Sequence, residues 1–298
     1  MREPPAGPAL GMSMWIRRLA ALACVLALAS AGYVALDRWQ RGMIFSVELG
    51  ERSWWRDPPA GTQVYDLPLP GGDTLRAWYW RHPDPGAPTV LYLHGSRWNL
   101  NGSAFRMEHW AGLGYSMLAI DYRGFGASSP RLPSQASVRQ DAQAALRELA
   151  RLQPDPARRF VYGHSLGGAI AIDLMARLDP PIPVAGLIVE ATFTSIRDMI
   201  ATTRWAGIPG FGLLVTQPFD SRDAIGKLRT PLLLLHGTGD RVVPPAMSDA
   251  LLAAARQSPH KRLVWLEGAS HSGASRSGAA YDDAVRGFIR SVRQAYPG

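Results

Sequence analysis

From residue 63 to the C-terminus, short apolar runs alternate with longer stretches in which apolar residues recur every three or four positions. Runs of the first kind predict buried strands, and stretches of the second kind predict helices that lay one face on a sheet. The predicted strands are 89–93, 115–120, 159–162, 184–189, 231–235 and 262–266, and the predicted helices are 138–152, 169–178, 245–255 and 281–295. This alternation favours an α/β domain with a mostly parallel central sheet and helices on both faces.

Two further β-rich runs, 63–69 and 74–81, precede this alternation and are separated by Pro70-Gly71-Gly72-Asp73. A turn of this kind between two strand patterns predicts an antiparallel hairpin. Residues 37–62 show no regular pattern and are expected to form a connector. We therefore expect the catalytic domain to occupy residues 63–298.

Residues 19–36 carry no charged side chain. As a helix this segment would be roughly 27 Å long, close to the hydrocarbon thickness of a bilayer, so it predicts a single membrane-spanning helix. Arg17 and Arg18 precede it, which favours a cytoplasmic location for residues 1–18. The catalytic domain would then lie on the non-cytoplasmic side of the membrane.

A cleaved signal peptide is the alternative interpretation of the same segment. Ala29-Ser30-Ala31 fits the small-residue cleavage site that follows the apolar core of such peptides. Cleavage there would give a secreted or periplasmic protein. Both interpretations export the catalytic domain, and the sequence leaves the choice open.

The chain has 298 residues and a formal net charge of +8. Its length suits one large α/β domain with a short appendage. Nearly all of the positive charge comes from scattered arginines, and no basic stripe of the kind that follows nucleic acid is present, so we expect no nucleic-acid partner. The arginines could meet an anionic membrane or simply face solvent. Cys24 is the only cysteine, which excludes an internal disulfide and a zinc site built from several thiolates.

The stretch Gly163-His164-Ser165-Leu166-Gly167 lies between a predicted strand and a predicted helix. In the pattern Gly-x-Ser-x-Gly the serine occupies a tight strand-to-helix turn, where the glycines avoid collisions with the neighbouring backbone. This geometry would expose the Ser165 hydroxyl as a nucleophile and direct the backbone N–H of Leu166 towards a developing oxyanion. An ordinary glycine-rich turn can show the same five letters, so the surrounding residues must decide.

A serine nucleophile needs a base to accept its proton and an acid to orient that base. Among the seven histidines, His271 stands in a flexible loop of small residues after the last predicted strand. Asp240 follows the preceding predicted strand in a short loop, and Glu190, one strand earlier, is the runner-up for the acid. The carboxyl ends of parallel strands lie along one edge of a sheet, so these side chains could meet near Ser165.

Five motifs occur in a characteristic order. They are His94-Gly95, residues 121–128, residues 163–167, residues 236–240 and residues 268–271. From about residue 63 to the C-terminus the chain therefore resembles the α/β-hydrolase superfamily, whose triad runs serine, acid, histidine. Residues 190–195 and 218–220 are further similar to the branch that contains single-span membrane-anchored acyl hydrolases and protein depalmitoylases.

This resemblance implies a role for each candidate residue. Ser165 would be the nucleophile, Asp240 the acid and His271 the base. The backbone N–H groups of Ser96 and Leu166 would form the oxyanion hole. The resemblance also implies an α/β-hydrolase fold that works without a metal or an organic cofactor.

Two segments are expected to contact the substrate. The loop after His94-Gly95 departs from the family pattern, because a bulky Trp98 stands where relatives often have small or amide residues. A short cap segment between the strand that ends at Glu190 and the next strand is rich in apolar side chains, including Trp205 and Phe211. We expect these two residues to line an acyl groove beside the nucleophile, although they could equally pack onto the core.

The sequence thus predicts a serine hydrolase that cleaves a carboxylic ester or thioester, of acyl or lipid type, through an acyl-enzyme intermediate. Its partners would be a small-molecule or lipid acyl ester and the membrane. One alternative is a serine peptidase of aminopeptidase type, which would need a carboxylate cluster to hold the substrate's α-amine. A catalytically silent membrane-tethered scaffold is the alternative outside enzymes.

Overall fold

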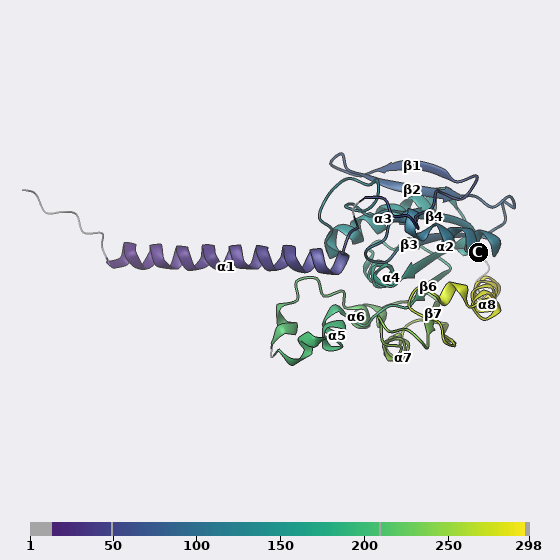
Figure 1. Ribbon diagram of the computed structural model, residues 1–298. Helices are drawn as coiled ribbons and strands as arrows, with labels where there is room; N and C mark the ends of the chain where they lie inside the picture. The colour runs from purple at the N-terminus through teal and green to yellow at the C-terminus, as the bar shows by residue number, and fades with distance from the viewer. Residues whose placement is uncertain (1–13, 49, 209, 296–298) are drawn as a thin grey trace, which may run out of the picture.

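The computed structural model describes residues 14–48, 50–208 and 210–295. Within them, eight strands form one sheet in the order β1-β2-β4-β3-β5-β6-β7-β8 (Figure 1). The strands are β1 (Gln63–Pro68), β2 (Thr74–Trp80), β3 (Thr89–Leu93), β4 (Ser116–Ile120), β5 (Arg159–His164), β6 (Gly186–Glu190), β7 (Leu232–Gly237) and β8 (Lys261–Leu266). β2 is antiparallel to β1 and to β4, and all other neighbours are parallel. The predicted hairpin and the mostly parallel sheet are confirmed.

Helices cover both faces of this sheet. They are α2 (Leu100–Gly112), α3 (Gln135–Leu152), α4 (Leu166–Arg177), α6 (Ser221–Ile225), α7 (Ala246–Ala254) and α8 (Ala279–Ala295). One core layer contains buried residues of α3, α4, α6 and α7, and the other contains buried residues of α2 and α8. Strands β3 to β7 are therefore buried on both sides, which explains their nearly continuous apolar runs.

Helix α2 is an element that the apolar periodicity did not predict. Asn99 caps it, because the Asn99 side-chain oxygen accepts a hydrogen bond from the N–H of Gly102 at 3.1 Å. Its buried face includes Met107 and Trp110. Small and polar residues with low helix propensity fill its first turn and interrupt the apolar pattern.

Helix α1 (Met14–Phe45) extends beyond both ends of the predicted span 19–36. Among the described residues it is the one helix long and apolar enough to cross a membrane, with a mean hydropathy of 2.2 over a window of which none is buried. Figure 1 shows α1 projecting from the domain as a long rod. Of its residues only Gln40 and Phe45, near the C-terminal end, are buried. The predicted cytoplasmic segment lies outside the described residues up to residue 13.

The predicted short cap segment connects β6 to α6. It contains α5 (Ile196–Ala201) and the 3-10 turns η2 (Arg204–Gly207) and η3 (Phe211–Leu214). In Figure 1 this green segment projects from the domain on the side from which α1 emerges. The cap is therefore close to the end of the apolar helix.

Candidate active site

Ser165 lies between the end of β5 and the start of α4. Its backbone has φ 55° and ψ −120°, an uncommon conformation for a residue with a side chain. A Cβ atom at Gly163 would lie 2.4 Å from the carbonyl oxygen of Gly167, and one at Gly167 would lie 2.0 Å from that of Leu93. Glycine is therefore required at positions 163 and 167, as the pattern Gly-x-Ser-x-Gly predicts.

The loops after β7 and β8 bring two side chains to Ser165. Nε2 of His271 lies 3.0 Å from Oγ of Ser165, and Nδ1 of His271 lies 2.8 Å from Oδ2 of Asp240. The Asp240 carboxylate only accepts when ionised, so Nδ1 of His271 donates to it and leaves Nε2 free to accept the serine proton. The structure thus brings the three predicted catalytic side chains into one hydrogen-bonded chain.

Asp240 is held as a carboxylate by several donors. Its Oδ1 accepts hydrogen bonds from the N–H groups of Val242 and Val243 at 2.8 and 2.9 Å. Burial opposes ionisation, but hydrogen bonds from His236 and His271 hold the pKa of Asp240 well below its usual range. The group is therefore negatively charged over the whole range in which a histidine base works.

His236 is a partner of Asp240 that the sequence did not reveal. Its Nε2 lies 3.1 Å from Oδ2 of Asp240 and 3.1 Å from the carbonyl oxygen of Val243, and its Nδ1 lies 2.6 Å from Oγ of Ser248. A carbonyl oxygen only accepts, so Nε2 carries the proton and Nδ1 accepts from Ser248. The motif His236-Gly237-Thr238-Gly239-Asp240, which separates the two side chains by four positions, is the available signal in the sequence.

The predicted oxyanion groups lie on two different elements. The N–H of Leu166 belongs to the first residue of α4, and Ser96 follows β3. Among the described residues, neither N–H donates a backbone hydrogen bond outside the regular elements. The loop of Ser96 is fixed by the end of α1, because the N–H of Arg97 donates to the carbonyl oxygen of Phe45 at 2.8 Å. Two free donors near the nucleophile are what an oxyanion hole needs.

A cavity of about 860 Å³ opens over Ser165 and His271. Trp98 lines it as expected, together with Met43 and Ile44 from the end of α1. No acidic residue is among the described residues that line it, whereas Arg97 and Arg241 are. The cavity is therefore partly apolar, with a cationic contribution.

Trp205 and Phe211 do not line this cavity, contrary to the expectation for an acyl groove. Their rings stack on each other with centroids 5.5 Å apart and planes 9° apart. The cap segment is instead tied to α1, because Nε2 of Gln40 donates to the carbonyl oxygen of Leu214 at 2.7 Å. These contacts with the apolar helix could not be read from the sequence.

Glu190, the alternative acid, belongs to a different network. It is fully buried, and its Oε1 accepts from Nη1 of Arg106 at 2.8 Å while its Oε2 accepts from the hydroxyl of Tyr162 at 2.5 Å. His164 connects this region to the base, since its Nε2 donates to the carbonyl oxygen of His271 at 3.1 Å. Glu190 therefore supports the floor of the site and does not contact the imidazole ring of His271.

His94 directly follows β3 and Asp121 directly follows β4. Nδ1 of His94 donates to the carbonyl oxygen of Gly95 at 2.7 Å, and burial lowers the pKa of His94 to about 4. Oδ1 of Asp121 accepts from the N–H of Leu100 at 2.8 Å, and burial raises the pKa of Asp121 to about 7. Neither side chain contacts Ser165.

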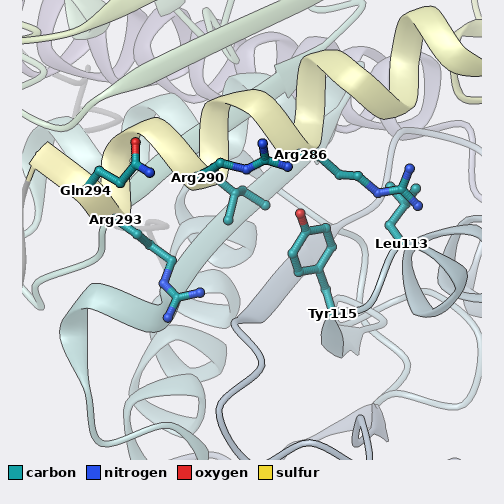
Figure 2. Close-up of a pocket in the computed structure, with 7 residues that line it drawn as sticks. Leu113, Tyr115, Arg286, Arg290, Arg293 and Gln294 are labelled. Carbon is teal, nitrogen blue, oxygen red and sulfur yellow. The ribbon is translucent and has the colours of Figure 1, made fainter.

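A second hollow, of about 460 Å³, lies at the other end of the strands, where Tyr115 immediately precedes β4 (Figure 2). Arg286, Arg290 and Arg293 of α8 extend along it. Its lining contains no serine, cysteine, histidine or carboxylate side chain. The one hydroxyl in the described lining belongs to Tyr115, and burial raises its pKa, so it is not ionised near neutral pH. Among the described residues, no group of three or more His, Cys, Asp or Glu side chains could hold a metal ion.

Comparison with known proteins places the chain in a family. Residues 85–217 and 220–274 match the family described as serine aminopeptidase, S33. An uncharacterized protein of Mycobacterium tuberculosis is 31% identical over 92% of this chain and 95% of its own length. The α/β hydrolase domain-containing protein WAV2 of Arabidopsis thaliana is 35% identical over 81% of this chain and 84% of its own.

One further relative and one solved structure are also similar to this chain. The lysophosphatidylserine lipase ABHD12 of Danio rerio is 30% identical over 61% of this chain and 50% of its own length. A Pyrococcus furiosus esterase structure superposes with a TM-score of 0.60 at 17% identity, covering 84% of this chain and all of that chain. Because its identity is low, the esterase likeness shows the fold alone.

Proposed function

This chain belongs to the α/β-hydrolase family described as serine aminopeptidase, S33, and on that premise we propose that it hydrolyses carboxylic esters or thioesters of apolar acyl chains. The observation that carries the proposal is the hydrogen-bonded chain Ser165–His271–Asp240 at the floor of a cavity partly walled by the apolar helix α1. A catalytically silent scaffold would not need a serine, a histidine and an aspartate joined by hydrogen bonds in this order.

The proposed reaction proceeds through an acyl-enzyme. Nε2 of His271 accepts the proton of Ser165 as Oγ attacks the carbonyl carbon, and the N–H groups of Ser96 and Leu166 stabilise the oxyanion. Collapse of the tetrahedral intermediate breaks the bond to the alcohol or thiol, which leaves with the proton from His271. Water then attacks the acyl-enzyme with His271 again as base, and Ser165 is regenerated.

The cavity lining favours an ester over a peptide substrate. An aminopeptidase must bind a positively charged α-amine, for which a carboxylate is the suitable partner. The described lining has no carboxylate. Of its two arginines, Arg97 forms an ion pair with Glu48 at 3.7 Å, and Arg241 would repel an amine. These arginines instead suit an anionic group beside the ester, as in an acidic lipid. The relative named lysophosphatidylserine lipase is consistent with such a substrate class.

We also propose that α1 anchors the domain in a membrane, with the domain on the non-cytoplasmic side. The uncharged run 19–36 has the length of a span, and Arg17 and Arg18 precede it. Removal of the segment as a signal peptide remains the alternative, and the mass of the mature protein distinguishes the two.

The test combines active-site labelling with a substrate panel. We expect a fluorophosphonate probe to label the wild type at Ser165. Octanoyl and palmitoyl esters should be preferred over acetyl esters, because each buried methylene adds up to about 0.8 kcal/mol of binding. An anionic lysophospholipid should be cleaved faster than its zwitterionic counterpart, and aminoacyl anilides should be poor substrates.

The side chains that wall the cavity provide the matched variants for this panel. Met43→Ala and Trp98→Ala should reduce the preference for long chains. Val64→Ala, on β1 and outside both the cavity and the cap, should leave chain-length preference unchanged. Preference for acetyl esters in the wild type, or faster cleavage of aminoacyl anilides than of esters, would refute the proposed substrate class.

A further inference from the structure

Helix α1 is joined to the catalytic domain by several contacts near its C-terminal end. The Phe45 side chain is fully buried, with its ring edge-on to those of Phe125 and Phe219 at 6.5 and 6.0 Å. Nε of Arg41 donates to the carbonyl oxygen of Pro133 at 2.7 Å. The C-terminal end of the helix is therefore packed into the domain.

The cap segment reaches α1 at the same level. In addition to the bond from Gln40 to Leu214, the N–H of Thr216 donates to Oε1 of Gln40 at 2.9 Å. Nε2 of Gln217 donates to Oδ1 of Asp37 at 2.8 Å, one helical turn nearer the N-terminus. The last turns of α1 and the cap thus form one contiguous surface.

The end of the cap segment exposes apolar side chains beside α1. We define the cap tip as residues 205–208 and 210–214. Within it, Leu213 is 79% exposed, Leu214 54% and Ile208 46%. Figure 1 shows this part of the green segment extending from the domain in the direction of the N-terminal end of α1. Exposed apolar side chains that gather on one short segment are typical of surfaces that contact a partner or a membrane.

The position of the cap tip along α1 points to a lipid partner. Gln40, which holds Leu214, lies four residues after Leu36, the last residue of the uncharged run 19–36. Four helical residues correspond to roughly 6 Å, which is the depth of the interfacial layer of a bilayer. A membrane that surrounds the uncharged run would therefore reach the cap tip.

We propose that the cap tip inserts into the bilayer interface next to α1 and gives the domain a second membrane contact. The proposal rests on the membrane-anchoring part of the proposed function. Met43 and Ile44, three and four residues beyond Gln40, line the catalytic cavity. Docking at both α1 and the cap tip holds the cavity at the lipid surface, so an acyl chain can pass from the bilayer towards Ser165.

Site-specific labelling of the full chain in phosphatidylcholine–phosphatidylglycerol vesicles tests this contact. Cys24 is the only cysteine and lies on the exposed surface of α1, so the wild type reports whether α1 is in lipid. Cys24→Ala/Leu213→Cys reports on the cap tip. Cys24→Ala/Val64→Cys is the matched control, because Val64 is an exposed apolar residue of β1, 43% exposed. Each thiol carries an environment-sensitive fluorophore.

We expect nitroxide-labelled lipids to quench the fluorophores at positions 24 and 213, and aqueous iodide to quench the one at position 64. Quenching at position 24 alone, with position 213 behaving like position 64, would overturn the second contact while leaving the anchor intact. A fluorophore at position 213 that is shielded from both lipid nitroxide and iodide would indicate a protein partner or a second copy, which also overturns it. No lipid quenching at position 24 would refute the anchor and the second contact together.

Activity provides an independent measurement. Leu213→Asp should lower turnover of a palmitoyl ester embedded in vesicles by about tenfold or more, because a carboxylate resists insertion at the interface. Turnover of a short, water-soluble ester should stay unchanged, since Leu213 is outside the catalytic cavity. Val64→Asp is the control and should change neither rate. Equal rates for Leu213→Asp and wild type on embedded ester would count against the proposal.

Discussion

The cavity over Ser165 and the arginine-lined hollow of Figure 2 lie at opposite ends of the same parallel strands. The cavity collects buried polar groups from the ends of several strands, and hydrogen bonds hold each of them. The hollow presents long arginine side chains from a single helix, α8, and Arg290 and Arg293 are exposed to solvent. Both regions are concave, but only the first has a nucleophile with its base and acid.

The difference shows that a concave surface alone does not identify an active site. At the carboxyl ends of the strands, each loop carries one functional group into a shared space, and the sheet fixes their relative positions. At the amino ends near β4, all charged side chains of the hollow come from one helix, and the lining has no carboxylate to oppose them. Substitutions at the two ends should therefore have very different effects.

The largest expected effect is on the nucleophile. Ser165→Ala should lower turnover by about 10⁶-fold and abolish fluorophosphonate labelling without unfolding the protein, because the hydroxyl is needed only for chemistry. His271→Ala should cost about as much. Arg290→Ala, at the opposite end of the strands, should leave turnover within about twofold of wild type. If Arg290→Ala lost as much turnover as Ser165→Ala, the conclusion that only the Ser165 end of the strands is catalytic would be wrong.

The next effect concerns the acid. Asp240→Asn should lower kcat by about 10⁴-fold, since an amide cannot stabilise the imidazolium and favours the wrong tautomer of His271. Steady-state kinetics and circular dichroism would separate this loss from unfolding. Glu190→Gln is the informative control, because Glu190 does not contact the His271 ring: if it cost as much as Asp240→Asn while the fold stayed intact, the acid would have been misassigned.

A smaller effect is expected at His236. His236→Phe removes the donor to Asp240 and should lower kcat by about tenfold with little change in KM, in line with the worth of a hydrogen bond to a charged group. His236→Gln should recover part of the rate, because its amide can still donate. Unaltered kcat in His236→Phe would show that the Asp240 carboxylate is held well enough by Val242 and Val243.

The last expected effect is on stability and not on turnover, and it depends on pH. Burial raises the pKa of Asp121 to about 7 from 3.8 in the unfolded chain. A raised carboxyl pKa contributes stability that is fully present below the unfolded value and is lost as the pH rises through about 7. Between about pH 5 and pH 8, wild type should therefore lose about 3 kcal/mol of unfolding free energy relative to Asp121→Asn.

Urea unfolding in detergent at several pH values measures this difference. Asparagine retains the oxygen that accepts the hydrogen bond from Leu100, so the variant should fold. Arg290→Ala should follow the wild-type pH dependence, since it removes no buried titrating group. If the unfolding free energies of wild type and Asp121→Asn changed with pH in the same way, Asp121 would ionise in the folded state well below pH 7.

The sequence predicted the sheet well because strands that are buried on both faces must be apolar along their whole length. It also identified Ser165, Asp240 and His271 as candidates, because each lies in a short segment with a recognisable pattern. The Arg106–Glu190 pair could not be predicted, since its partners are 84 positions apart and meet only through packing of α2 on the sheet. Trp205 and Phe211 are not among the residues that line the cavity, because the cap takes its position from α1, and no local pattern encodes that contact.

The hydrogen bond from Arg97 to Phe45 has a consequence for how the chain can be processed. A cut after Ala31 would remove most of the apolar helix but leave residues 32–45. The buried ring of Phe45 would stay in place, and so would the hydrogen bond from Arg97 that supports the Ser96 loop. Such a product would no longer be anchored by α1, but it would keep the contacts that support the active site. A cut between Arg41 and Arg97 would disconnect that support, so the position of a single proteolytic cleavage would decide between a released enzyme and a damaged one.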